Sequence, residues 1–90
     1  MDKWRECMLG FFADRWNDAA PNVTLYLVGG HVVTGMLDYS EYQLSTPDDT
    51  NPQLTGEDIL NIKKSGRIDL MVGGSEFSTH VDLVVGYSTF

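Results

Sequence analysis

The sequence predicts a single α+β domain that is mainly β. An N-terminal amphipathic helix precedes a strongly bent antiparallel sheet or small open barrel of about five strands. Three observations support this prediction. Apolar residues recur with a helical period over residues 2–19, the period changes to two from residue 23 onward, and the glycine pairs at 29–30 and 73–74 separate alternating segments. Ninety residues suffice for one domain, which we assign to residues 1–90.

The predicted helix covers residues 2–19. Its apolar side chains recur at intervals of four, with two more alongside, and form one broad stripe: Trp4, Met8, Phe12 and Trp16, with Cys7 and Phe11. Asp2 can cap the start, and Pro21 prevents continuation because the residue before a proline disfavours the helical conformation. Since packing against a core selects this spacing, we interpret the stripe as core.

The first predicted hairpin joins a strand near 23–28 to a returning strand at 31–44. Gly29 and Gly30 supply the positive φ angles of a tight turn. Gly35 lies in mid-strand, where a glycine permits strong curvature. Tyr42 falls out of phase with the preceding alternation, so we expect a bulge or sharp bend near Ser40.

The second half begins with a predicted loop at 45–58, which is rich in proline and acidic residues. Residues 59–67 fit either a short helix that begins at Thr55 or a strand. The chain then alternates again, which predicts strands at 67–72 and 77–87.

Residues 23–37, VTLYLVGGHVVTGML, resemble the first motif of the Sm-like family of small β-barrels. The motif combines alternating apolar residues, a turn glycine at Gly30, and a strand-bending glycine at Gly35 followed by Leu37. Glu41 stands where that family usually has an aspartate. The resemblance covers residues 2–44. It implies a bent barrel and ring formation, in which the last strands of one subunit pair with the next.

The family's RNA-binding residues have no clear counterpart in this sequence. Tyr42, Gln43 and Leu44 stand where its base-holding asparagine is expected, and His80 lacks the adjacent basic residue of the family's second motif. The resemblance therefore implies architecture rather than RNA binding. The alternative of a nucleotide or RNA contact requires that the candidate residues gather around a pore or an intersubunit cleft: Lys63, Lys64, Arg67 and His80.

The formal net charge is −7, from 13 acidic and 6 basic residues, and no Lys or Arg lies between Arg15 and Lys63. Such a segment repels a phosphate backbone, so we do not expect nucleic-acid binding from it. The acidic residues form either a solubilising surface or an acidic interaction face for a basic partner. The candidate face comprises Asp38, Glu41, Asp48, Asp49, Glu57 and Asp58.

The sequence contains no recognisable catalytic or metal-binding motif, and we predict no cofactor. Cys7, His31 and His80 lack the spacing of metal ligands. Asp82 follows His80 by two residues on the same predicted strand face. This placement favours an ion pair on the solvent side over a catalytic dyad. We therefore do not expect an enzyme.

These observations predict a non-enzymatic, oligomeric interaction module that acts through protein–protein contacts. The long apolar final strand supports oligomer formation, because an exposed strand edge of this kind favours pairing with another chain. Two alternatives remain: an acidic inhibitor or nucleic-acid mimic of the phage counter-defence type, which would occupy a basic nucleic-acid-binding protein, and a nucleotide- or RNA-binding ring. The single cysteine and the lack of a long apolar run predict a cytoplasmic protein without a membrane span.

Overall fold

The computed structural model describes residues 2–43 and 53–90. An N-terminal helix precedes an open, five-stranded antiparallel sheet, which confirms the predicted fold class. The elements in chain order are α1 (Lys3–Asn17), β1 (Asn22–Leu27), β2 (His31–Leu37), the 3-10 helix η1 (Ser40–Gln43), α2 (Gly56–Ser65), β3 (Arg67–Val72), β4 (Ser75–His80), the 3-10 helix η2 (Val81–Leu83) and β5 (Val84–Thr89). The strand order is β4-β3-β2-β1-β5.

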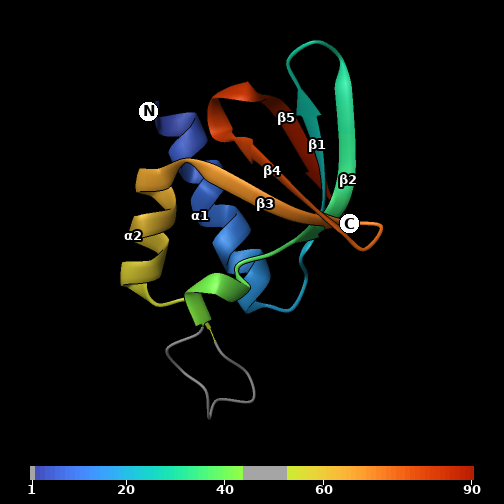
Figure 1. Cartoon of the computed structure of the whole chain (residues 1–90). Helices are drawn as coiled ribbons and strands as arrows, with labels where there is room; N and C mark the ends of the chain where they lie inside the picture. Colours follow the sequence, from blue (N-terminus) through green and yellow to red (C-terminus); the bar gives the residue numbers. More distant parts are fainter. Residues whose placement is uncertain (1, 44–52) are drawn as a thin grey trace.

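Helices α1 and α2 lie side by side on one side of the strands, and the β1–β2 hairpin extends away from them (Figure 1). One hydrophobic core joins α1, α2 and the inner face of the sheet. Its fully buried side chains include Met8, Leu9 and Phe12 from α1, Ile62 from α2, and Leu25, Ile68, Leu70, Val81 and Val84 from the strands and η2.

Helix α1 begins as predicted, with the Asp2 carboxylate accepting the Arg5 N–H at 3.1 Å. Its apolar stripe is divided. The buried face carries Met8, Leu9, Phe12 and Ala13, whereas Trp4, Cys7 and Phe11 are exposed. The exposed half of the predicted stripe is therefore available for contact with another molecule.

The sharp bend of the sheet occurs at Gly35. A Cβ at this position would lie 2.6 Å from the Met71 carbonyl oxygen and 2.9 Å from Val72 Cγ2. Strand β3 therefore passes directly over Gly35, and the residue must lack a side chain. After this close approach β2 pairs with β3 at two positions, Met36 with Met71 and Leu37 with Leu70.

The predicted strand at 31–44 is too long. Strand β2 ends at Leu37, and η1 follows at Ser40–Gln43. The Asp38 side chain accepts hydrogen bonds from the Ser40 N–H (3.1 Å) and hydroxyl (2.7 Å), which favours a turn at this point. This turn accounts for the change of phase at Tyr42 that the sequence shows.

The predicted loop at 45–58 also ends too late, because α2 begins at Gly56. Residues 59–65 are helical, which resolves the ambiguity of that segment. Thr55 and Asp58 form a capping box: the Thr55 hydroxyl accepts the Asp58 N–H (3.1 Å) and the Asp58 carboxylate accepts the Thr55 N–H (2.9 Å).

The predicted strand at 77–87 is two strands. Strand β4 ends at His80, η2 spans Val81–Leu83, and β5 begins at Val84. The 3-10 turn shifts the alternation by one residue, so Val84 enters the core and Val85 is 62% exposed. Val81 and Val84 are both buried, although one uninterrupted strand would direct them to opposite faces.

The side chain of Tyr39 is buried in the core. Its ring meets Trp16 edge-on at a centroid distance of 5.8 Å, and its hydroxyl is buried without a hydrogen-bond partner among the described residues. Burial raises the pKa of Tyr39 well above its ordinary value near 10, and the neighbouring Tyr42 and Asp69 raise it further.

We predict a Tyr39-dependent loss of stability in alkaline solution. Above about pH 10 the unfolded chain releases the Tyr39 proton whereas the folded chain retains it, so the free energy of unfolding falls as the pH rises further. The expected slope from this residue is about 1.4 kcal/mol per pH unit. Urea unfolding of Tyr39→Phe should lack this part of the slope; identical slopes for the two proteins would contradict the prediction.

Candidate interaction site

The sheet has two open edges, β4 and β5. In the described part of the chain, β4 pairs with β3 alone and β5 pairs with β1 alone. The Val81 N–H donates to the Gly66 carbonyl (N···O 2.7 Å), which fixes the side of β4 that bonds to β3. Because backbone groups alternate between the two sides of a strand, those of Glu76 and Ser78 point away from the sheet.

The same reasoning identifies the free groups of β5. The Leu37 N–H donates to the Pro21 carbonyl (2.9 Å), so odd-numbered residues of β2 bond to β1. Alternation and the observed register then place the even-numbered residues of β1 and β5 between these two strands. The backbone N–H and C=O groups of Tyr87 and Thr89 therefore point away from the sheet.

Helix α1 flanks β5 along its length. The Phe11 and Tyr87 rings lie 5.9 Å apart, and the Arg15 guanidinium donates to the Phe90 carbonyl at 3.2 Å. A shallow concavity of about 350 Å³ near the start of both elements is lined by Asp2, Trp4, Arg5, Val84 and Val85. We define the β5 edge surface as the free groups of β5 together with the exposed side chains of Trp4, Cys7, Phe11 and Val85.

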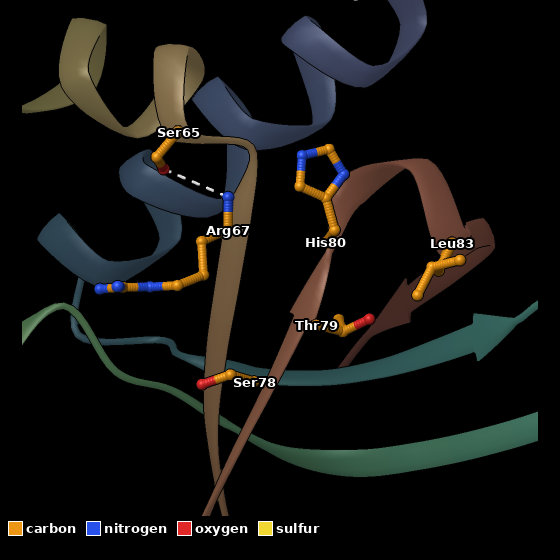
Figure 2. A pocket seen from close by; sticks show the side chains of 6 residues that line it. All are labelled: Ser65, Arg67, Ser78, Thr79, His80 and Leu83. Atoms are coloured by element: carbon orange, nitrogen blue, oxygen red, sulfur yellow. Dashed lines mark hydrogen bonds between the residues drawn. The ribbon is translucent and has the colours of Figure 1, made fainter.

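The β4 edge carries a second shallow concavity, of about 470 Å³, shown in Figure 2. It is lined by Ser65, Arg67, Ser78, Thr79, His80 and Leu83. In Figure 2, Arg67 and Ser78 extend to one side of the two strands, and Thr79 extends to the other side, toward Leu83. Leu83 is half exposed and supplies an apolar contact beside the open strand.

Arg67, Asp69 and Glu41 form a cluster of paired charges beside β4. Arg67 Nε donates to Asp69 Oδ2 at 3.0 Å, and its terminal nitrogen binds Glu41. The Ser78 hydroxyl donates to Asp69 Oδ1 at 2.5 Å. Asp69 is only 8% exposed, and these bonds compensate for the burial of its charge. This cluster fixes η1 and β4 against β3.

Most of the acidic candidates form hydrogen bonds or ion pairs with other groups of the chain. Asp38 holds η1, Asp58 caps α2, and Glu41 binds Arg67, whereas Glu57 is exposed in the first turn of α2. Asp48 and Asp49 lie outside the described residues. The described candidates therefore do not form a row of unpaired carboxylates.

The basic candidates lie near one corner, where α2 ends, β3 begins and β4 ends. The Lys63 side chain packs over Gly10, and Lys64 is exposed. The two carboxylates already described occupy the Arg67 guanidinium. His80 Nδ1 accepts the Asp82 N–H at 3.1 Å.

His80 Nδ1 lies 3.4 Å from Asp82 Oδ2, and both side chains are largely exposed, but this nitrogen accepts the Asp82 backbone N–H and does not donate to the carboxylate. Asp82 also lies 3.8 Å from Arg5 Nε. Over residues 2–43 and 53–90, no group of three or more potential metal ligands comes together. No helix in this part of the chain is long and apolar enough to cross a membrane.

Two features of the site were missed by reasoning from the sequence. Asp69 was not singled out, although an acidic residue between the apolar Ile68 and Leu70 indicates a polar group on the outer face of a strand. The break before β5 was also missed. The side chain that caps this 3-10 turn is His80, whose Nδ1 accepts the Asp82 N–H.

No protein-family model matches the sequence, and a comparison with curated proteins finds no relative.

Proposed function

We propose that this chain is a non-enzymatic interaction module of Sm-like architecture that assembles with further copies of itself. In this proposal, β4 of one copy pairs with β5 of the next. The last strands of neighbouring subunits pair in this way in the Sm-like family, and in this chain the last two strands are the two open edges of the sheet.

The observation that carries the proposal is the complementarity of the two edges. Within the described part of the chain, each of the two strands presents two unpaired N–H and two unpaired C=O groups, those of Glu76 and Ser78 on β4 and those of Tyr87 and Thr89 on β5. An antiparallel pair of these strands would satisfy these groups and continue the hydrogen-bond pattern of the sheet.

The composition of the β5 edge supports the same proposal. Proteins protect an open strand from unwanted pairing with charged residues, with proline or with a covering element. Residues 83–90 contain no charged residue and no proline. The β5 edge surface adds exposed aromatic and aliphatic side chains, which are typical of protein interfaces.

The alternatives have less support. A nucleic-acid mimic requires carboxylates available to a basic groove, but Asp38, Glu41 and Asp58 are engaged within the chain. A nucleotide- or RNA-binding ring requires several free cations, but the Arg67 guanidinium is shared between Glu41 and Asp69, although Lys64 is exposed at the same corner.

The proposal predicts that a charge on the β5 edge reduces the mass of the assembly. Val85→Glu places a carboxylate on that edge, where pairing would bury it. Leu60→Glu is the matched control: it replaces another exposed aliphatic residue (52%, against 62% for Val85) on α2, away from both edges. By sedimentation velocity we expect the assembly of Val85→Glu to have a smaller mass than that of the unmodified chain. The assembly of Leu60→Glu should have the same mass as that of the unmodified chain. Equal masses for all three proteins would contradict the proposal.

A further inference from the structure

Strand β2 has a third open edge, in the half of the strand that precedes the Gly35 bend. Residues 31–36 of β2 pair with β1, and the Leu37 N–H bonds to Pro21 just before β1. In the described structure only Met36 and Leu37 pair with β3. Among the described residues, no strand therefore pairs with 31–34 on the side away from β1. They belong to the hairpin that extends away from the helices in Figure 1.

The free backbone groups of this segment can be identified. The Leu37 N–H bonds toward β1, at Pro21, whereas the Asp38 N–H bonds to the Asp69 carbonyl of β3 (2.9 Å). Even-numbered residues of β2 therefore direct their backbone groups away from β1. Val32 and Thr34 each present one unpaired N–H and one unpaired C=O on this edge.

The surface around these groups carries no formal charge at neutral pH. Residues 19–37 include no Asp, Glu, Lys or Arg, although the whole chain has 13 acidic and 6 basic residues. The outer face of the hairpin instead exposes Val32 (59%) and its cross-strand partner Tyr26 (42%). An uncharged, exposed edge rich in β-branched residues lacks the usual protection against strand pairing.

We propose that this edge binds the same edge of a second copy, as an antiparallel β2–β2 pair about a two-fold axis at Val33. Val32 of each copy then lies opposite Thr34 of the other, and all four free groups on each chain find partners. The side chains keep their faces, because residues opposite each other in this register are both even or both odd.

A second copy is the occupant that matches this edge, because the free groups of Val32 and Thr34 on one copy complement those on the other in this register. Two chains of net charge −7 repel each other wherever their acidic surfaces meet. The hairpin is a surface without carboxylates, so two copies can approach there with the least repulsion. The second copy also supplies the strand that this edge needs, because its own β2 is exposed, uncharged and free on one side. The inference rests on the proposed function, since it adds a second interface to the same edge-to-edge assembly.

The first experiment measures mass in the Val85→Glu background, where β4–β5 pairing is disrupted. We expect two chains for Val85→Glu alone and one chain after the further change Val32→Lys/Thr34→Lys. The matched control is Tyr26→Lys/Thr24→Lys. It breaks the same cross-strand contacts, including the 2.9 Å approach of the Thr24 and Thr34 hydroxyls, and adds the same charge to the same face. Its mass should remain that of two chains.

The outcomes separate the two interfaces. A single-chain mass for Val85→Glu, with a larger unmodified assembly, would overturn the β2–β2 pair and leave the β4–β5 proposal standing. Strand addition by a different protein would give the same single-chain result and would also overturn it. If Val85→Glu keeps the unmodified mass and the β2 lysines reduce it, the β4–β5 proposal fails and the β2–β2 pair stands.

A disulfide tests the register in the Cys7→Ser background. Residues opposite each other at a non-hydrogen-bonded position lie about 4.5 Å apart between Cα atoms, which is within disulfide range. Val33→Cys should therefore form cross-linked dimers under mild oxidation. Val32→Cys should cross-link much less, although Val32 is the more exposed residue, because Val32 faces Thr34 of the second copy. Preferential cross-linking of Val32→Cys would overturn the proposed register.

Discussion

Gly35→Ala is expected to lower the free energy of unfolding by about 3 kcal/mol, the upper part of the usual range for overpacking. The new methyl carbon would lie 2.6 Å from the Met71 carbonyl oxygen and 2.9 Å from Val72 Cγ2. Neither neighbour can move independently, because Met71 and Val72 belong to β3, which is paired with β4 over its whole length. The close approach must open, and with it the bend of the sheet.

Gly86→Ala is the matched control for this prediction. Gly86 also lies within a strand, but a Cβ there would meet only the Tyr26 ring, at an ordinary 3.8 Å. Urea unfolding should show a large decrease in the midpoint for Gly35→Ala and little change for Gly86→Ala. Similar midpoints for the two variants would show that the crossing of β2 and β3 is not the reason for glycine at position 35.

Phe12→Ala is expected to cost about 3–5 kcal/mol, as is typical for a fully buried phenylalanine. Phe12 has no exposed surface, and its ring meets that of Tyr87 edge-on at 5.1 Å. It therefore joins α1 to β5, the strand that carries the proposed interface. Loss of this contact should destabilise the fold and the β5 edge together.

Phe11→Ala distinguishes packing from assembly at the neighbouring residue. Phe11 is 39% exposed, and its ring centroid lies 5.9 Å from that of Tyr87. We expect Phe11→Ala to lower the free energy of unfolding by about 1 kcal/mol or less, because little of the core is lost. The assembly should nevertheless shift measurably toward smaller species. Thermal unfolding and sedimentation velocity on both variants would check this. If Phe11→Ala left the mass unchanged, the β5 edge surface would not include that residue.

Local chemistry explains which parts of the fold were predictable. Asp2 and Thr55 are side chains that cap helices, and the glycine pairs have positive φ angles at both turns. Strand β3 was predicted at its observed bounds because its alternation is uninterrupted and a glycine lies at each end. These elements depend on interactions between residues that are close in sequence.

The incorrect boundaries depend on side chains that interrupt a strand pattern. Strand β2 stops at Leu37 because the Asp38 carboxylate accepts the Ser40 N–H and hydroxyl, although the Asp38 N–H still bonds to the Asp69 carbonyl, 31 positions away in the sequence. The single strand predicted at 77–87 is divided where the His80 side chain accepts the Asp82 N–H and caps η2. Alternating apolar residues could not indicate either contact.

The candidate site shows the same limit. The sequence identified the apolar final segment as a potential open edge, but only the strand order shows that β4 and β5 are the two edges of the sheet. The free half of β2 depends on the brief β2–β3 pairing, which follows from the approach of Met71 to Gly35. The apolar residues Trp4 and Phe11 were assigned to the core, because spacing alone does not show which half of a broad stripe is covered.

Sedimentation equilibrium of the unmodified chain at micromolar concentration tests edge-to-edge assembly most directly. If the open edges pair, the measured mass exceeds that of one chain and rises with concentration toward a defined multiple. A mass equal to one chain throughout the micromolar range would contradict the assembly proposed for β4 and β5 and the β2–β2 pair inferred from it.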